Sequence, residues 1–483
     1  MKLKRVLQSL TCALLVGLST HSAHAINESQ LPDIGTAGVS ALSIDREIVY
    51  GNAFMRIARA QLPIIDDPVL NEYLDDLGQR LVSRASDVRF PFTFFLVKDD
   101  TINAAAFLGG KVKVHSGLFL NAATESELAS VLAHEISHVT QRHIARYMEA
   151  QTRQTPVTIA GLVGSVALAI LNPTVGIAAL QTTMGLQVQS AINYTRDNEY
   201  EADRIGMKLL YDAGFEPMGM ANFFQKLAAS YRYATKPPEM LLTHPLPETR
   251  IAEARSRAAN FPRQSPHNEA DFLFAKARIQ VRFSQETPDG MLSYFEHQIS
   301  RTGKQNHLLY GKALALLALN RTQDAAVIIN DLAQRFPDDL FILDTQTDID
   351  MANQRYAQAI QRLESQQARL PDNSVVIFNL ASCYMQQNQL PKAAKLLDLY
   401  VRNHPESDLG WRTLVDVYQQ AGDETNLHLA YAESKALSGD YMRAMDELNL
   451  ARATSSDKLV LARIDARLVQ LEEAKRLDES LRQ

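Results

Sequence analysis

The second half of this 483-residue chain carries a 34-residue period, which restricts its fold more than any other feature. Two columns of residues keep the period, one of prolines and one of alanines that lie twelve residues earlier: Pro337, Pro371 and Pro405, and Ala325, Ala359 and Ala393. A period of this length is typical of stacked helical repeats, in which each unit buries its apolar face only against its neighbours. The second half is therefore predicted to be an all-α solenoid.

The period is that of the tetratricopeptide repeat. Trp411, Leu414 and Tyr418 reproduce the W-x2-L-x3-Y face of a first repeat helix. Prolines and serine interrupt the helical pattern just before this region, so we place the repeat domain at 265–483, with a closing helix over 459–481. A solenoid presents a concave face that holds a peptide or another protein, so its expected role is binding. We therefore expect the chemistry in residues 26–264.

The first 25 residues have the form of an export signal. Lys2, Lys4 and Arg5 precede an apolar run, and Ala23-His24-Ala25 matches the small-x-small cleavage pattern. Without the signal the chain keeps 46 Lys and Arg against 55 Asp and Glu, so the formal net charge moves from -6 to -9. This acidic balance argues against a nucleic-acid partner. The mature chain retains one cysteine, Cys383, and hence no intramolecular disulfide, and we expect it in the periplasm.

The mature sequence has one long apolar segment, at 157–180. Its first part gives 15 residues before Asn172-Pro173, which is short of the roughly 20 that span a bilayer as a helix. The segment is therefore not predicted to be transmembrane. Three interpretations stay open: a buried core hairpin, a mobile lid, or a patch that makes peripheral contact with a membrane.

A metal-binding pattern lies in the middle of the first half. His134-Glu135-Ile136-Ser137-His138 has the H-E-x-x-H form within a helix-compatible stretch. Residues four apart share a helical face, so His134 and His138 can bind one ion while Glu135 reaches a water bound to it. His143 lies five residues past His138, about 140° around the helix, and should therefore face away.

A catalytic zinc commonly takes three protein ligands, so a third must come from elsewhere in the chain. Glu199 opens another predicted helical stretch, with Asp203 four residues later on the same face. Glu199 is the preferred third ligand and Glu201 the alternative. Asp203 is then placed to accept the far N–H of a liganding histidine and orient it.

These motifs resemble a gluzincin of the CAAX-prenyl protease and HtpX-like metallopeptidase family. The stretch from Ile102 to Phe107 with Gly109-Gly110 is similar to the family's substrate edge strand, and Thr243-His244-Pro245 with Arg250 is similar to its T-H-P-x-x-x-R element. The likeness covers about 48–255. An export signal in front and repeats behind make the architecture similar to soluble periplasmic members that act on outer-membrane β-barrel proteins.

The resemblance implies an endopeptidase with one Zn²⁺ per chain, in which Glu135 activates the water. Asn103, Ala104 and Ala105 would belong to the strand that pairs with an extended substrate. The family's aspartate, here Asp203, is also assigned a proton-donating role. The expected fold is an α+β zincin-like domain, mainly helical with a small sheet, followed by the all-α repeat solenoid.

Two residues of the T-H-P-x-x-x-R element keep several interpretations. His244 can hydrogen-bond the reaction intermediate, occupy the water's position as a fourth ligand that keeps the enzyme latent, or be a structural loop residue; we favour latency. Arg250 is a candidate oxyanion contact or the partner of an acidic residue.

The expected function is zinc-dependent proteolysis with chaperone-like activity in the assembly and quality control of outer-membrane β-barrel proteins. The expected partners are unfolded or misassembled barrel proteins, together with their assembly machinery, which would contact the repeats. The alternatives are a chiefly non-proteolytic chaperone or adaptor and a general scavenger peptidase.

Overall fold

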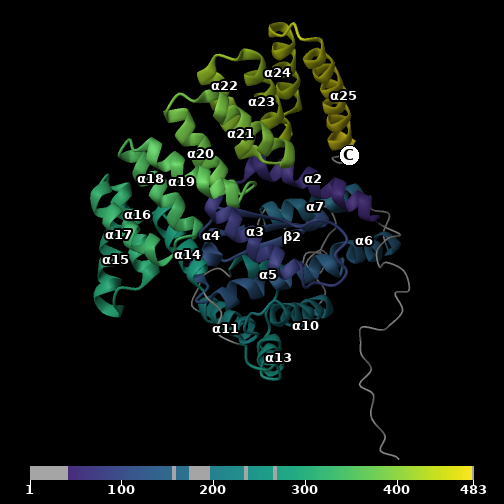
Figure 1. Cartoon of the computed structure of the whole chain (residues 1–483). Coiled ribbons are helices and arrows are strands. Elements are labelled where there is room, and N and C mark those ends of the chain that lie inside the picture. The colour runs from purple at the N-terminus through teal and green to yellow at the C-terminus, as the bar shows by residue number, and fades with distance from the viewer. Residues whose placement is uncertain (1–41, 155–158, 173–195, 233–237, 265–268, 481–483) are drawn as a thin grey trace, which may run out of the picture. The chain divides into compact units, whose positions relative to one another are not determined.

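The structure is a computed structural model that describes residues 42–154, 159–172, 196–232, 238–264 and 269–480. The predicted export signal lies outside these residues. Figure 1 shows a small sheet surrounded by helices, followed along the chain by helix pairs up to α25. As the sequence predicts, a mainly helical domain with a small sheet is followed by a long run of helices.

The sheet has three strands in the order β1-β3-β2. β1 (Thr93–Val97) runs parallel to β3 (Lys111–His115), and β2 (Ala104–Phe107) is antiparallel to it. A short 3-10 turn, η2 (Leu108–Gly110), joins β2 to β3. Its Gly109 and Gly110 have φ values of 68° and 71°, a backbone region that favours glycine. β2 is thus an edge strand of the described sheet.

The two faces of the sheet pack against different helices because successive side chains alternate in direction. Leu96, Ala104 and Val112 join the large core on the side of α5. Phe95 and Ala105 join a second core with residues of α2, α6 and α7. The sheet is therefore buried on both faces, with its β2 edge beside α5.

Ten helices of the described residues lie in the first half of the chain. They are α2 (Ile44–Gln61), α3 (Pro68–Val82), α4 (Ser116–Asn121), α5 (Glu125–Thr140), α6 (His143–Gln154), α7 (Ile159–Leu171), α10 (Arg196–Asp212), α11 (Met218–Arg232), α12 (Glu239–Thr243) and α13 (Glu248–Ala258).

α7 covers the first part of the apolar segment 157–180. Val163, Ala167 and Ile170 are buried in the second core, so the described part of this segment packs as core. Residues 173–195 lie outside the described part of the chain. Among the helices that the structure describes, none combines the length and apolar character needed to cross a membrane.

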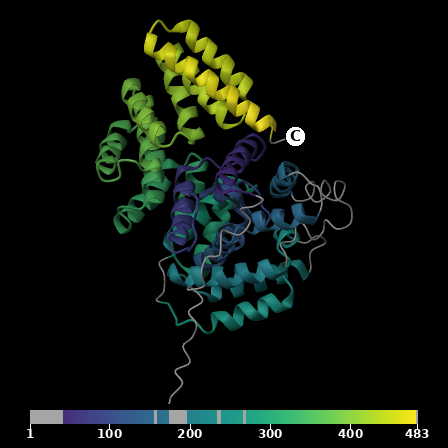
Figure 2. The same ribbon diagram turned by 90° about the vertical axis from the view of Figure 1, so that its right-hand side faces the viewer.

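Twelve helices of the described residues follow one another in the second half of the chain. They are α14 (Ala270–Phe283), α15 (Pro288–Thr302), α16 (Asn306–Ala318), α17 (Thr322–Arg335), α18 (Leu340–Ala352), α19 (Tyr356–Arg369), α20 (Ser374–Gln386), α21 (Leu390–Asn403), α22 (Asp408–Ala421), α23 (Glu424–Leu437), α24 (Tyr441–Thr454) and α25 (Lys458–Ser480). α25 matches the predicted closing helix and lies beside α24 (Figure 2).

The two sequence columns have different structural roles. Ala325, Ala359 and Ala393 are fully buried on the second helices of successive pairs. Pro337 and Pro371 come directly after the C-caps of α17 and α19, where proline ends a helix. The 34-residue period thus arises because each repeat places an alanine at a buried helix position and a proline after a helix end.

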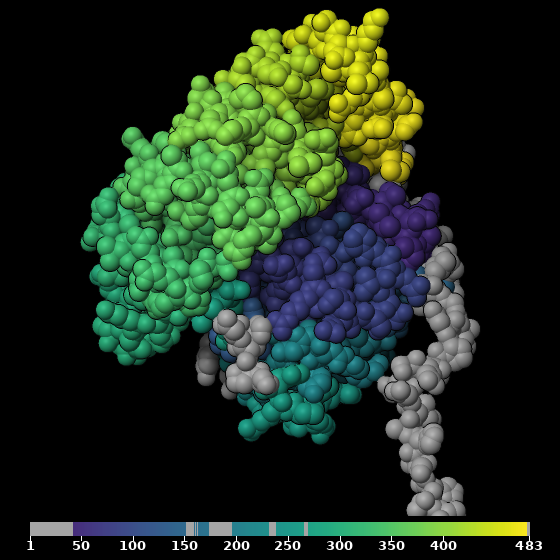
Figure 3. All heavy atoms as spheres, in the orientation of Figure 1, coloured from purple at the N-terminus to yellow at the C-terminus, as the bar shows by residue number. Residues whose placement is uncertain are grey.

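The helices of the first half and the repeat helices are joined by buried and half-buried polar contacts. Asn373 and Ser374, at the start of α20, donate to the Glu72 carboxylate of α3 over 2.8 and 2.6 Å. Figure 3 shows the purple surface around α3 adjoining the green surface of the repeats. α14 packs on both α4 and α16, and residues 265–268 are not described, so the division at 264/265 stays a prediction.

An arginine of α14 connects the same two regions. Arg278 is 1% exposed and donates to Asp67, the N-cap residue of α3, over 2.8 Å. Its other end lies 2.7 Å from the Asp344 carboxylate of α18. Tyr310 accepts a third hydrogen bond from the guanidinium at 3.2 Å. A buried arginine with two carboxylate partners fixes α3, α14 and α18 against one another.

Candidate metal centre

The start of the helix that carries the H-E-x-x-H motif, α5, is fixed by hydrogen bonds at its N-terminal cap. Thr124 accepts a hydrogen bond from the Glu127 N–H at 3.2 Å, while the Glu127 side chain accepts from the Ala123 N–H at 2.7 Å. This is a reciprocal cap of the kind that starts helices strongly. Every residue of α5 is buried, so the motif lies in the interior.

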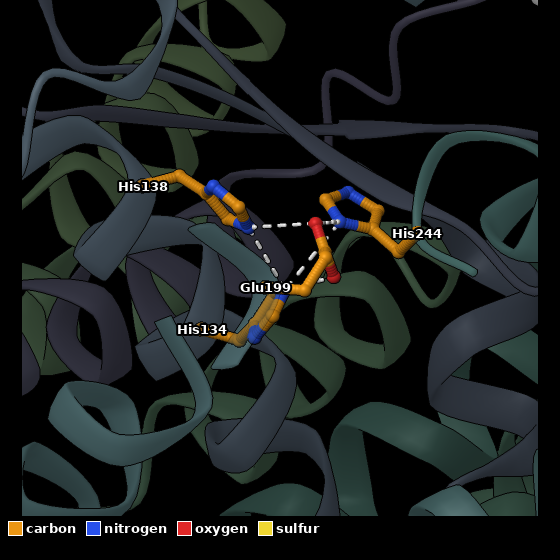
Figure 4. A group of neighbouring side chains, drawn as sticks. All are labelled: His134, His138, Glu199 and His244. Atoms are coloured by element: carbon orange, nitrogen blue, oxygen red, sulfur yellow. Dashed lines mark hydrogen bonds and ion pairs between the residues drawn. The ribbon is translucent and has the colours of Figure 1, made fainter. Parts of the chain in front are cut away.

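His134 and His138 point the same way from α5, as their spacing predicts. Their Nε2 atoms are 3.0 Å apart (Figure 4). Glu199, from the first turn of α10, places its carboxylate oxygens 3.5 Å from each of these two nitrogens. The three side chains are 98% buried. The structure therefore gathers two imidazole nitrogens and one carboxylate around a common point.

Asp203 lies one turn further along α10, behind His134. Its Oδ1 is 3.0 Å from Nδ1 of His134, on the imidazole edge opposite to the nitrogen that faces His138. Burial lowers the pKa of His134, but hydrogen bonds to Asp203 and Glu199 outweigh burial and raise this pKa to about 10. The two carboxylates thus favour positive charge at this imidazole.

Arg250, from α13, contacts the same two carboxylates. Its guanidinium donates to Asp203 over 2.7 and 2.8 Å and lies 2.7 Å from Glu199. Arg250 is 2% exposed, and its Nη1 also donates to the Pro245 carbonyl at 2.7 Å. These contacts favour the pairing interpretation of Arg250 over a direct oxyanion contact.

A glycine allows α10 to lie this close to α5. A Cβ at Gly206 would stand 3.1 Å from the backbone of Ala133 and His134. Asp203 and Glu199 lie three and seven residues earlier on the same helix, and therefore on nearly the same face. The small residue thus lets both carboxylates reach the histidines.

His244 enters the centre from the C-cap of the short helix α12. Its Nδ1 is 3.0 Å from Glu199 Oε1, and its Nε2 is 3.4 Å from Glu135 Oε1. His134, His138, Glu199 and His244 each offer a ligand atom, and these atoms lie within 4.8 Å of one another. The histidine of the T-H-P element therefore lies between the general-base candidate and the third ligand candidate.

Glu135 connects the centre to the edge strand. Its Oε2 accepts a hydrogen bond from the Ala106 N–H of β2 at 2.9 Å, and its Oε1 has no hydrogen-bond partner within the described residues. Burial raises the pKa of Glu135, although the charges of His244 and His134 act in the opposite direction. One carboxylate oxygen is thus held by the strand, while the other faces His244.

The predicted orientation of His143 is wrong. α5 ends at Thr140, Arg142 has a φ of 53°, and α6 begins at His143, so the two histidines do not share one helix. The His143 Nδ1 lies 2.7 Å from Nδ1 of His138. His143 therefore supports His138 from behind, a contact that a continuous helix would not allow.

Glu201 belongs to this supporting layer. Its Oε2 lies 3.1 Å from His143 Nε2 and 2.9 Å from Arg146 Nη1. It is not in the group of four residues whose ligand atoms converge. The geometry therefore favours Glu199 as the third ligand.

The predicted substrate strand borders the centre directly. Asn103 precedes β2 and Ala104 and Ala105 begin it. The Asn103 carbonyl bonds the His115 N–H of β3, so the outward backbone groups of β2 alternate at Ala104 and Ala106. An extended chain could pair with that edge beside Glu135.

The kinds of ligand atom in this group indicate which metal ion would fit. Imidazole nitrogens with one carboxylate suit zinc, and three protein ligands leave a position for water. The partner of the first histidine is also present, because Asp203 holds the far nitrogen of His134. The residues therefore fit a catalytic zinc, with His134, His138 and Glu199 as its proposed ligands.

Comparison with known proteins agrees with this arrangement. Residues 68–258 match Peptidase family M48, and residues 350–416 match a tetratricopeptide repeat. The beta-barrel assembly-enhancing protease of Yersinia pestis is 42% identical over 94% of this chain and 93% of its own. That of Escherichia coli K12 is 40% identical over 97% of this chain and 96% of its own. The mitochondrial metalloendopeptidase OMA1 of Schizosaccharomyces pombe is 31% identical over 37% of this chain and 50% of its own.

The two beta-barrel assembly-enhancing proteases match the metal centre and the repeats together, and the centre has the residues that a metallopeptidase requires. The chain belongs to the family of the beta-barrel assembly-enhancing proteases, as a family M48 metallopeptidase with tetratricopeptide repeats.

Proposed function

We propose that this chain is a periplasmic zinc endopeptidase with chaperone-like activity that acts in the assembly and quality control of outer-membrane β-barrel proteins. The observation that carries the proposal is the convergence of His134, His138 and Glu199 beside Glu135 and the β2 edge. The names of the full-length relatives support the β-barrel clients. The form of the first 25 residues supports export.

The chain's own residues account for most of the mechanism. An extended client pairs with the outer edge of β2, which places its peptide bond beside Glu135. A zinc ion supplies a Lewis acid that lowers the pKa of a bound water toward 7. Glu135 Oε1 accepts the proton of the attacking water and returns it to the leaving amine. Asp203 keeps His134 oriented as a ligand.

His244 is placed to regulate access of water to the centre. Its ring lies between Glu135 and Glu199, in the space that the attacking water needs, and it is 4% exposed. We therefore propose that the described arrangement is latent. An exported protease that was always open would degrade unfolded clients on their way to assembly.

The test combines metal content with cleavage. Wild type, Glu135→Gln and His244→Ala chains are assayed for zinc stoichiometry and for cleavage of an unfolded outer-membrane barrel protein. We expect one zinc per chain, weak cleavage by wild type and a loss of roughly 10²- to 10⁴-fold in Glu135→Gln. Absence of zinc and of cleavage in all three chains would contradict the proposal.

The repeats favour a second, non-proteolytic role as an adaptor, because a solenoid is a binding surface. Glu135→Gln separates the two roles, since it removes the base and leaves the ligands and repeats intact. Full rescue of barrel-assembly defects by this variant would show that the adaptor role dominates.

A further inference from the structure

The turn that carries His244 is held at both ends. On its C-terminal side, Arg250 donates to the Pro245 carbonyl at 2.7 Å. On its N-terminal side, helix α12 begins at Glu239 without a side-chain cap. Within α12, Met240 is buried in the core and its carbonyl accepts the His244 N–H at 2.8 Å. The position of His244 therefore depends on what holds α12.

Glu239 is held by the residue that precedes the edge strand. The Asn103 Nδ2 donates to Glu239 Oε2 at 3.2 Å. Asn103 is 2% exposed, and its Oδ1 has no hydrogen-bond partner within the described residues. Its backbone carbonyl is fixed by the His115 N–H at 3.0 Å. The contact thus joins the His244 turn to the start of β2.

A buried lysine of β3 acts on the same carboxylate through its charge. Lys113 is 1% exposed on the face of β3 that also carries Lys111 and His115, and its Nζ donates to the Ile170 carbonyl near the end of α7 at 2.5 Å. Burial lowers the pKa of Lys113 to about 8, while the charges of Glu239 and Asp99 act in the opposite direction. Among the described residues no ion pair joins Lys113 to Glu239, so the hydrogen bond from Asn103 is the direct contact that holds this carboxylate.

We propose that Glu239 is a positioning residue that holds His244 in the metal centre through its hydrogen bond from Asn103, so that pairing of a peptide with β2 and release of His244 are coupled. The inference rests on the proposed latency. A chain that pairs beside Ala104 competes for the Asn103 amide one residue away. When that contact breaks, α12 turns about the Pro245 anchor and withdraws His244.

The first test measures the turn itself and needs no catalysis. Hydrogen exchange of residues 238–247 is compared in Glu135→Gln chains that carry Glu239→Ala, Glu239→Gln or the control Glu248→Ala, an exposed glutamate of α13. We expect Glu239→Ala to speed exchange of the His244 amide roughly two- to tenfold, the weight of one hydrogen bond. In the Glu239→Gln chain, which keeps an acceptor for Asn103, the exchange rate should lie between those of the parent and of Glu239→Ala. The Glu248→Ala chain should exchange at the rate of its parent.

Addition of an unfolded barrel protein extends this test to the coupling. It should speed exchange of the same segment in the Glu135→Gln chain and add little in the chain that also carries Glu239→Ala. Equal exchange in all chains, with or without the barrel protein, would overturn the proposal.

The second test asks whether Glu239 acts through His244. In zinc-loaded enzyme, Glu239→Ala should raise cleavage of the unfolded barrel protein roughly two- to tenfold and add nothing in a His244→Ala background. Gains that multiply in the double variant would reject the coupling. If His244→Ala alone gives no gain, the latency is wrong, and the exchange experiment still decides the role of Glu239.

Discussion

Asp203 Oδ1 lies 3.0 Å from Nδ1 of His134, on the imidazole edge that faces away from His138. A carboxylate in this position selects the tautomer and the orientation of a histidine that binds metal. The same aspartate is held by Arg250. The ligand geometry is therefore anchored from α10 and α13 at once.

Asp203→Asn is expected to weaken zinc binding by roughly 10- to 100-fold, because the charge that orients His134 is lost. Competition with a chelator measures this affinity without reference to activity. Asp212→Asn is the control, since Asp212 lies on the same helix and contacts only Lys208 among the described ion pairs. Equal affinity of the two variants would show that Asp203 does not support the ligand.

His244→Ala is expected to raise cleavage of an unfolded barrel protein several-fold, roughly two- to tenfold if the ring is retained by one net hydrogen bond. The reason is that its nitrogens contact Glu199 and Glu135, where the attacking water would lie. Single-turnover rates of zinc-loaded chains provide the measurement. A fall in rate would mean that His244 assists the reaction instead of blocking it.

Gly206→Ala is expected to lower both stability and zinc affinity. The new Cβ would stand 3.1 Å from the backbone at Ala133, so α10 must move away from α5 and carry Glu199 with it. Such overpacking costs about 1–3 kcal/mol of the free energy of unfolding. Urea unfolding and chelator competition measure the two effects.

The matched control is Gly164→Ala in α7, where a Cβ meets no atom within 4 Å. This change should be neutral or should stabilise the helix by about 1 kcal/mol, because alanine favours helix over glycine. Similar losses in the two variants would show that close approach of α10 and α5 is not the cause.

Arg278→Ala is expected to destabilise the chain by about 3–5 kcal/mol, because it leaves the buried carboxylates of Asp67 and Asp344 without their shared partner. Urea unfolding measures the loss. Arg301→Ala, in the last turn of α15 and exposed, should stay within about 0.5 kcal/mol of wild type. If both variants unfold like wild type, the buried arginine does not hold α3, α14 and α18 together.

Glu125 predicts a pH dependence of stability. Burial raises its pKa to about 7 from 4.5, although the hydrogen bond from Tyr73 acts in the opposite direction. The folded state therefore binds more protons than the unfolded state between about pH 4.5 and 7. Stability from this group is complete below the unfolded pKa and is lost as pH rises through the folded one.

Glu125→Gln removes this dependence while keeping an acceptor for Tyr73. The variant should gain stability relative to wild type at pH 8, and the gain should shrink toward pH 5. Urea midpoints at the two pH values give the comparison. A gain that stays constant with pH would exclude titration of Glu125 as the cause.

The sequence by itself determined the elements that rest on local spacing. The H-E-x-x-H spacing places His134 and His138 on one helical face whatever surrounds them, because a helix repeats every 3.6 residues. The proline and alanine columns likewise mark helix ends and helix contacts in each repeat. Glu199 and Asp203 follow the same rule on α10.

Contacts between distant elements were decided only by the tertiary structure. His143 reaches His138 because Arg142, with its positive φ, ends the helix between them. No pattern of residues in the sequence predicts this break. The partners of Arg250 lie 47 and 51 residues earlier, and they meet it only because α10 and α13 pack together.

No sequence pattern indicates the contact that ties the His244 turn to the sheet. Asn103 and Glu239 are 136 residues apart, and Lys113 resembles an ordinary exposed residue of an alternating strand until α7 covers it. Periodicity identifies which face of an element is apolar. It cannot identify which distant polar group the fold brings to that face, because that depends on packing between elements whose order in space is not periodic.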